Sequence, residues 1–478
     1  MLRIFILAIF ILTSVSATAK EEQLVLQPEL SKFQGRLTFQ YFLDIVKRSH
    51  PKIIQAQLDK RRAEAQRIEA QGAFDPSISS GNFFNRFNSS SAVGDVQNAF
   101  TTDTSIDWLS GYGAKFSAGG KLASGDIKTP ISPTGDAGEY YLRAQVPLLR
   151  NAIYNEKNVK EQQAKLKENI ADFKLYQKKL EVIKEAIFNY WKWISDHEIL
   201  RAQEGLLEIN RNQVEQAQEQ VKFGGLANIE AVELQREVQK RLGAVAKQLM
   251  SYNTAAIKLT NDLWQENGQP FAILVTENVP ELRLDIDTSS IPSTFDAKLN
   301  ALENRPEFKS IQKFKEIAVF NRKFAKNQML PALDLYGYQG VEFGGDSIGP
   351  TTQAGVELLL PLRNRRASGK LKQAKIDLEK LNVQERQLAQ QVFLEIENAA
   401  QLLENNLKAF NAARDELEFA QQLADGEKSK FDLGASTIFL VIRRQRSLID
   451  AKINMIKSFA QFKIAAAEFV LAQGMIEL

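Results

Sequence analysis

The sequence predicts a mainly α-helical fold that carries short β-hairpins and is built from two tandem repeats. Pro51 and Pro76 recur as Pro306 and Pro331, each displaced by 255 residues, and the residues around the two pairs are similar. Long stretches without proline follow each copy, and short segments of alternating apolar and polar residues lie between the predicted helices. A repeat at a fixed spacing determines how the other elements are interpreted.

Residues 1–19 have the plan of a cleavable signal peptide. Arg3 precedes an apolar run over residues 4–12, and small residues at 17–19 provide a cleavage site. The apolar run is shorter than the ~20 residues of a spanning helix. We therefore expect the mature chain to begin near Lys20 and to be exported. The sequence has no cysteine, so we expect neither disulfides nor a lipid-bearing cysteine.

The mature chain divides into four parts. We expect an N-terminal segment at residues 20–36, a first structural repeat at 37–269, a linker at 270–297 and a second repeat at 298–478. Four prolines mark the passages between strand and helix: Pro76, Pro147, Pro331 and Pro361. A Phe-Gly turn signal ends the long helix of each repeat, and the predicted turn residues are Phe223, Gly225, Phe431 and Gly434.

Each repeat is predicted to contain a hairpin of long helices. No proline lies between Pro147 and Pro270, and none follows Pro361. Apolar residues recur at steps of three and four, as in a coiled coil: Phe173, Tyr176, Leu180, Ile183, Ile187, Tyr190 and Ile194 in the first repeat, and Ala399, Leu403, Phe410, Ala413, Leu417, Ala420 and Ala424 in the second. About 70 helical residues span roughly 100 Å, which no compact globule contains.

Four strands are predicted between the helices. Apolar residues alternate with mostly polar ones over residues 140–146 and 354–360, and the opposite strands cover 77–87 and 332–340. The first hairpin holds 41 residues more than the second, because Pro76 and Pro147 are 71 residues apart and Pro331 and Pro361 only 30. Residues 104–108 and 114–122 within this excess have strand character. The pattern leaves open whether the excess adds strands to the sheet or forms an external hairpin.

An exported chain with short amphipathic strands points to a bacterial outer-membrane barrel, in which strands of ~9 to 11 residues cross the membrane. Four strands cannot close a barrel, and lipid does not tolerate unpaired strand edges. Several copies must therefore share one wall, and a trimer would contribute about 12 strands. The long helices would then leave the membrane as a second, helical tube.

The sequence resembles the TolC family of outer-membrane efflux proteins over essentially the whole mature chain. The resemblance is carried by the duplicated, ordered motifs Arg48-Ser49-His50-Pro51 and Asn304-Arg305-Pro306-Glu307, Phe74-Asp75-Pro76-Ser77 and Leu330-Pro331-Ala332-Leu333, the two Pro-Leu strand exits, and Phe431 to Gly434 followed by Gln445-Arg446-Ser447-Leu448. It implies a homotrimer in the outer membrane of a Gram-negative cell, with a 12-stranded β-barrel in lipid, a helical barrel in the periplasm and an equatorial region around residues 270–297. It also implies a periplasmic adaptor (membrane fusion protein) and an inner-membrane pump of the RND or ABC type.

The resemblance implies a gate at the periplasmic tip, where acidic residues one and two helical turns past the turn glycine ring the pore. In the second repeat these positions hold Leu440 and Arg443, which are not acids. The first repeat carries Glu230 and Glu233 one turn apart. We expect Glu230 or Glu233 to pair with Arg443, Arg444 or Arg446 across neighbouring helix pairs. The alternative is that these charges only solvate the tip.

Composition excludes several classes of function. The net charge of +3 gives no argument for a nucleic-acid partner, and no Gly-rich phosphate loop precedes a helix. The two histidines, His50 and His197, are expected on helix surfaces, and with no cysteine we expect no catalytic site, no metal site and no cofactor. The competing interpretation is an exported periplasmic adaptor or scaffold built from helical hairpins. The sequence does not identify the cargo.

Overall fold

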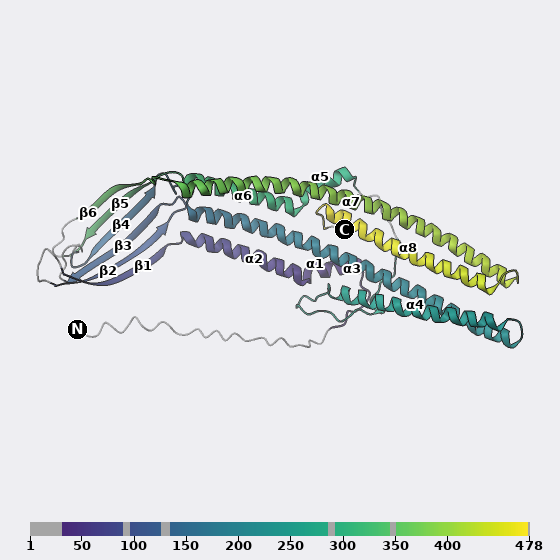
Figure 1. Cartoon of the computed structure of the whole chain (residues 1–478). Coiled ribbons are helices and arrows are strands. Elements are labelled where there is room, and N and C mark those ends of the chain that lie inside the picture. Colours follow the sequence, from purple (N-terminus) through teal and green to yellow (C-terminus); the bar gives the residue numbers. More distant parts are fainter. Residues whose placement is uncertain (1–30, 89–95, 126–133, 285–291, 345–349, 477–478) are drawn as a thin grey trace, which may run out of the picture.

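The computed structural model describes residues 31–88, 96–125, 134–284, 292–344 and 350–476. The predicted signal peptide lies outside these residues. The molecule is elongated, with a β-sheet at one end and the tips of two helical hairpins at the other (Figure 1). Long helices connect the two ends, as the proline-free stretches predict.

One antiparallel sheet contains six strands in the order of the chain. They are β1 (Ser77–Asn88), β2 (Val96–Leu109), β3 (Lys115–Gly125), β4 (Glu139–Pro147), β5 (Ala332–Glu342) and β6 (Thr351–Leu359). The expected number of four strands per chain, which implied 12 in a trimer, is therefore wrong for the described residues. The 41-residue excess forms β2 and β3, which separate β1 from β4 and pair with both of them.

The first repeat contributes α1 (Phe39–Ser49), α2 (Pro51–Gln71), α3 (Glu156–Lys222) and α4 (Asn228–Thr260). The second contributes α5 (Thr294–Asn304), α6 (Pro306–Asn327), α7 (Arg365–Asp432) and α8 (Ile438–Ala472). Short 3-10 turns occur at η1 (Gly72–Phe74) and η2 (Thr276–Asn278). At its 67 residues α3 is ~100 Å long, since each helical residue adds ~1.5 Å.

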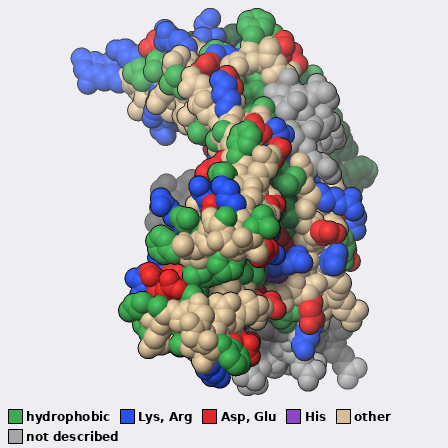
Figure 2. Space-filling model, turned by 90° about the vertical axis from the view of Figure 1, so that its right-hand side faces the viewer, with side chains coloured by type: hydrophobic (Ala, Val, Ile, Leu, Met, Phe, Trp, Pro, Cys, Tyr) green, Lys and Arg blue, Asp and Glu red, His purple; other side chains and the backbone are tan. Residues whose placement is uncertain are grey.

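The helices form an open layer. Nearest the sheet the neighbours run in the order α2, α3, α6 and α7; toward the tips the order is α4, α3, α8 and α7. The layer therefore has two free edges that continue the two edges of the sheet. Viewed from the tips, it is curved and hollowed on one side (Figure 2).

Two apolar clusters hold the layer together near its middle. The first joins α1, α3 and α4 around Phe42, Tyr190 and Trp193. The second joins α7 and α8 around Phe410 and Phe459. Most of the predicted seam residues are buried, including Ile183, Ile187 and Ile194 in α3, because steps of three and four place them on one face of the helix.

Each hairpin turns through the same backbone motif. Gly224 and Gly434 have φ angles of 72° and 73°, in the left-handed region that suits glycine. In the first turn the N–H of Gly224 donates to Val221 O and that of Gly225 to Gln220 O, and the second turn repeats both bonds. The structural equivalence is therefore Gly224 with Gly434. Phe223 matches Leu433, whereas the sequence suggested a match with Phe431.

Candidate functional site

The two faces of the sheet differ sharply in chemistry. Residues paired across antiparallel strands point to the same side, so the register divides each strand into two sets. One set carries a band of exposed apolar side chains: Ile78, Phe84, Phe100, Ile106, Trp108, Phe116, Leu122, Tyr140, Leu142, Leu335, Val341, Val356 and Leu358. We call this side the apolar face. The surface of a soluble monomeric protein rarely exposes so extensive a band of apolar side chains.

The opposite side, which we call the polar face, carries hydrogen bonds from one strand to the next. The carboxylate of Asp107 in β2 accepts from Ser79 of β1 at 2.9 Å and from Ser117 of β3 at 2.6 Å. The hydroxyl of Tyr141 in β4 donates to Asp103 of β2 at 2.7 Å. These bonds connect the inserted strands to their neighbours through side chains as well as backbone.

The same ladder continues to the other edge of the sheet. The guanidinium of Arg143 lies 5.2 Å from the ring centroid of Tyr141 and 5.7 Å from that of Tyr338. Tyr336 donates to Glu357 of β6 at 2.8 Å. By register the polar face carries the carboxylates Asp103, Asp107, Glu139, Asp334, Glu342 and Glu357 and the cations Lys115, Lys121 and Arg143. It is a polar, net acidic surface.

The turn between β2 and β3 is attached to the start of α3. The side chains of Asn155 and Asn158 donate to the carbonyl oxygen of Gly111 at 2.9 and 3.0 Å. Gly113 has a φ of 80° and lies so close to the chain that an added Cβ would be 2.4 Å from the carbonyl oxygen of Asn151. This turn thus lies where the sheet meets the helices.

The predicted turn residues lie at the tips. Phe223 is 90% exposed and its equivalent Leu433 is 84% exposed. The two tips contact each other, because Ile438 and Ile442 of α8 pack against an apolar cluster in the first hairpin. Gln213 of α3 also donates to Gln445 of α8 at 3.0 Å.

The two turns are 210 residues apart, so each gate candidate in the first repeat has an equivalent position in the second. Glu230 is equivalent to Leu440, and Glu233 to Arg443. Within the chain, Glu233 pairs with Arg236 at 3.3 Å on its own helix.

The three predicted arginines differ in their contacts. Arg444 faces Glu427 at 3.9 Å and Arg446 faces Asp450 at 3.8 Å. Among the residues that the structure describes, neither Glu230 nor Arg443 has an ion-pair partner in the same chain. The expected pairs between the glutamates and the arginines therefore do not form within one chain.

The second tip contains a polar triad that sequence analysis missed. Glu427 accepts from Ser436 and faces Arg444, and its side chain is only 13% exposed. The equivalent positions in the first tip are Ala217, Leu226 and Leu234, which pack as an apolar cluster. Superimposing the repeats with the offset of 210 would have revealed this difference.

Replacing Arg444 with leucine should loosen the second tip. The change leaves the Glu427 carboxylate largely buried without its cation, at a cost of roughly 1 to 2 kcal/mol. We expect amide hydrogen exchange at residues 425–445 to become about 5- to 30-fold faster. The variant Glu427→Ala/Ser436→Leu/Arg444→Leu copies the first tip and should restore slow exchange. Equal exchange rates in wild type and Arg444→Leu would show that the triad does not stabilise the tip.

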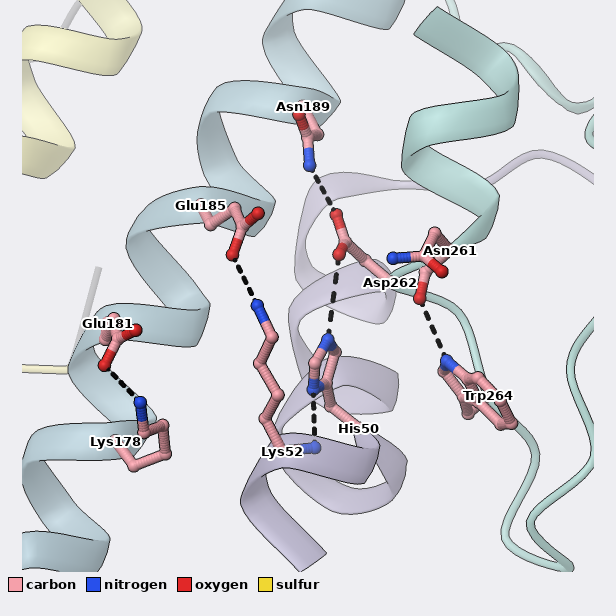
Figure 3. Close-up of polar contacts among 9 residues, drawn as sticks. All are labelled: His50, Lys52, Lys178, Glu181, Glu185, Asn189, Asn261, Asp262 and Trp264. Atoms are coloured by element: carbon pink, nitrogen blue, oxygen red, sulfur yellow. Dashed lines mark hydrogen bonds and ion pairs between the residues drawn. The ribbon is translucent and has the colours of Figure 1, made fainter. Parts of the chain in front are cut away.

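A second polar cluster lies near the middle of the molecule, between α2, α3 and the end of α4 (Figure 3). His50 Nδ1 accepts from the backbone N–H of Lys52 at 3.2 Å and caps α2, while His50 Nε2 lies 3.7 Å from Asp262. Asn189 donates to Asp262 at 2.7 Å. The expectation of a surface histidine is wrong for His50, which is 4% exposed, because the imidazole replaces the usual short capping side chain.

The pKa shifts in and near this cluster arise from hydrogen bonds and burial within the fold. A hydrogen bond from Lys52 to Glu185, 2.9 Å long, raises the pKa of Lys52. Burial raises the pKa of Tyr190, whose hydroxyl donates to Leu37 O at 3.0 Å. The hydrogen bond from His197 lowers the pKa of Glu198. The contact of Lys52 joins α2 to α3, that of Tyr190 attaches α3 to the segment before α1, and His197 and Glu198 are neighbours on α3.

In the described ranges, no cluster of His, Cys, Asp or Glu side chains is arranged to hold a metal ion. The helices that the structure describes include none with an apolar stretch sufficient to cross a bilayer.

Comparisons with known proteins identify the fold. No protein-family model matches the chain, and no curated protein is significantly similar in sequence. Solved structures do match. The outer-membrane channel OprN has a TM-score of 0.68 at 12% identity, with 91% of this chain and 89% of that chain covered. The outer membrane protein VceC from Vibrio cholerae has a TM-score of 0.65 at 12% identity, covering 91% and 95%. The CmeC outer membrane channel of Campylobacter jejuni has a TM-score of 0.64 at 13% identity, covering 94% and 90%. The chain therefore has the fold of these outer-membrane channels, in line with the resemblance seen in the sequence.

Proposed function

We propose that this chain is one subunit of a homotrimeric efflux duct in the outer membrane of a Gram-negative cell. The observation that carries the proposal is the two-faced sheet. Its apolar band suits lipid, and its net acidic polar face suits a water-filled lumen. The similar fold of solved outer-membrane channels supports the same assignment.

The free edges support assembly from several copies. Along one edge, α7 exposes a row of apolar side chains: Ile376, Val383, Leu394, Leu402, Phe419 and Leu423. The other edge exposes Leu58 and Ile68 of α2 and Ile229, Val232, Leu249, Met250 and Ile257 of α4. Two apolar edges on one curved layer suit closure into a ring, in which the α7 edge of each copy covers the α2 and α4 edge of the next.

The helical part would form a periplasmic tunnel that conducts passively. We place the gate at the hairpin tips and assign the closed-state contacts to Glu230 and Arg443, which are free to pair between copies. Leu440 would narrow the same level without adding charge. A periplasmic adaptor and an inner-membrane pump, in a tripartite efflux or type I secretion system, would supply cargo and energy.

The proposal is tested by purifying the mature protein from outer membranes and measuring its mass and its conductance in planar bilayers. We expect a trimer that dissociates on heating and forms pores. A soluble periplasmic monomer without conductance would overturn the duct and favour the scaffold alternative.

Arg443→Ala should raise the current of the closed state. An exposed pair contributes ~0.2 to 1 kcal/mol, and three symmetric pairs together would change the open population by about 3- to 160-fold. Arg446→Ala is the matched control, since Arg446 already faces Asp450 on its own helix. An unchanged closed-state current in Arg443→Ala would remove Arg443 from the gate.

A further inference from the structure

We infer that the membrane wall of the assembled protein is a continuous sheet of eighteen strands, in which β1 of one copy pairs with β6 of a second copy of this chain. The inference rests on the proposed trimer and adds to it the composition and width of the wall. Three copies of six strands give eighteen. The occupant of each free sheet edge is thus another subunit.

The directions of the edge strands permit this closure. Every neighbouring pair in the sheet is antiparallel, so β1 and β6 run in opposite directions. Placing β6 beside β1 of the next copy therefore continues the alternation without a parallel pair. The two edges also match in chemistry, because Ile78 of β1 and Leu358 of β6 both belong to the apolar face. Closure satisfies the edge N–H and C=O groups, which lipid would leave unpaired.

The inserted strands are part of the wall and do not form an external hairpin. If β2 and β3 lay outside, β1 would pair directly with β4, and the bonds from Ser79 of β1 to Asp107 and from Tyr141 of β4 to Asp103 would be lost. On the apolar face, the hydroxyls of Ser80 and Thr104 form a hydrogen bond of 2.8 Å, and the Thr102 hydroxyl donates to the side-chain oxygen of Asn82 at 2.9 Å. These hydroxyl pairs between β1 and β2 satisfy polar groups that would otherwise face lipid.

A wall of this size changes the shape of the duct. Four helices per copy at each level would give twelve around the tunnel, whereas the sheet contributes eighteen strands. Barrel diameter grows roughly linearly with strand number, so the membrane part would be about 1.5 times as wide as a twelve-stranded barrel. Barrels of 16 to 18 strands leave an aqueous channel. The narrowest point would then lie in the helical part, and the sheet would admit solutes that the tips exclude.

Thiol labelling tests which face of β3 lines the lumen, because the chain has no cysteine of its own. Lys121→Cys lies on the polar face and Leu122→Cys is its neighbour on the apolar face. With trimers in a planar bilayer, a water-soluble methanethiosulfonate is added from the sheet side. We expect it to reduce the current of Lys121→Cys and to leave Leu122→Cys unlabelled. Labelling of both positions without loss of current would place the hairpin outside the wall.

Two further measurements address the edge and the width. Ser80→Cys in β1, combined with Thr352→Cys, Ala354→Cys or Val356→Cys in β6, should give a disulfide-linked trimer upon oxidation for at least one pair. Neutral polymers added from the sheet side should enter a bore about 1.5 times that of a twelve-stranded barrel. A conducting trimer with no linkage in any pair and a twelve-strand bore would refute the eighteen-stranded wall while leaving the duct intact. Absence of a trimer or of conductance would refute both.

Discussion

Replacing Phe410 with alanine lowers the free energy of unfolding by about 3 to 5 kcal/mol, the range for removing a buried phenylalanine ring. Phe410 of α7 is 1% exposed and contacts Phe459 and Phe462 of α8, with ring centroids 5.3 and 6.4 Å apart. Removing the ring leaves a cavity between α7 and α8 beside Phe459 and Phe462. The loss should appear as a lower denaturant midpoint of the helical circular dichroism signal.

The matched control is Phe188→Ala in α3. Phe188 is 53% exposed and lies on a helix inside the layer, away from both free edges. We expect this change to alter the unfolding free energy by no more than ~0.5 kcal/mol. Equal midpoints for the two variants would mean that the α7–α8 cluster does not limit the stability of the second hairpin.

The helical hairpins could be predicted from the sequence because their signals are local and redundant. Long stretches without proline indicate a continuous helix, and apolar residues at steps of three and four indicate the same helix. The seam also predicted burial correctly at Ile183, Ile187, Phe410 and Ala413. A tandem repeat then doubled the evidence for each hairpin.

The inserted strands were harder to predict because their alternation is weak. β2 places Thr102 and Thr104 on its apolar face, and β3 places Ala118 and Gly120 there. Their side chains resemble those of a polar loop. They are strands because their backbones pair with both neighbours, and the serine bonds to Asp107 add to this pairing. Such contacts between segments cannot be read from one segment.

The tips show the same limit on a smaller scale. Phe223 and Phe431 both stand shortly before a glycine, so the sequence suggests that they are equivalent. The backbone of each turn, however, requires a residue in the left-handed region, and Gly224 and Gly434 occupy that position. Matching the phenylalanines shifted the comparison by two residues. That shift hid the exchange of an apolar cluster for the triad of Glu427, Ser436 and Arg444.

Gly113→Ala should strongly destabilise the junction between the sheet and the helices. The backbone has a φ of 80°, and a Cβ would lie 2.4 Å from Asn151 O and 3.2 Å from the ring of Pro147. A left-handed non-glycine residue costs ~1 to 3 kcal/mol, and the backbone clash adds to it. The turn must move away from α3, which breaks the bonds from Asn155 and Asn158 to Gly111 O. We expect the proposed trimer to dissociate at a lower temperature on a semi-native gel.

Gly111→Ala provides the control, because it changes the same turn by the same atoms. No atom lies within 4 Å of a Cβ at Gly111, and its carbonyl oxygen remains free to accept from both asparagines. This variant should dissociate at the wild-type temperature. If the two variants behave alike, the close approach at Gly113 does not hold the inserted hairpin on α3, and the attachment must come from the sheet pairing alone. A selective effect of Gly113→Ala would instead tie the stability of β2 and β3 to the first turn of α3.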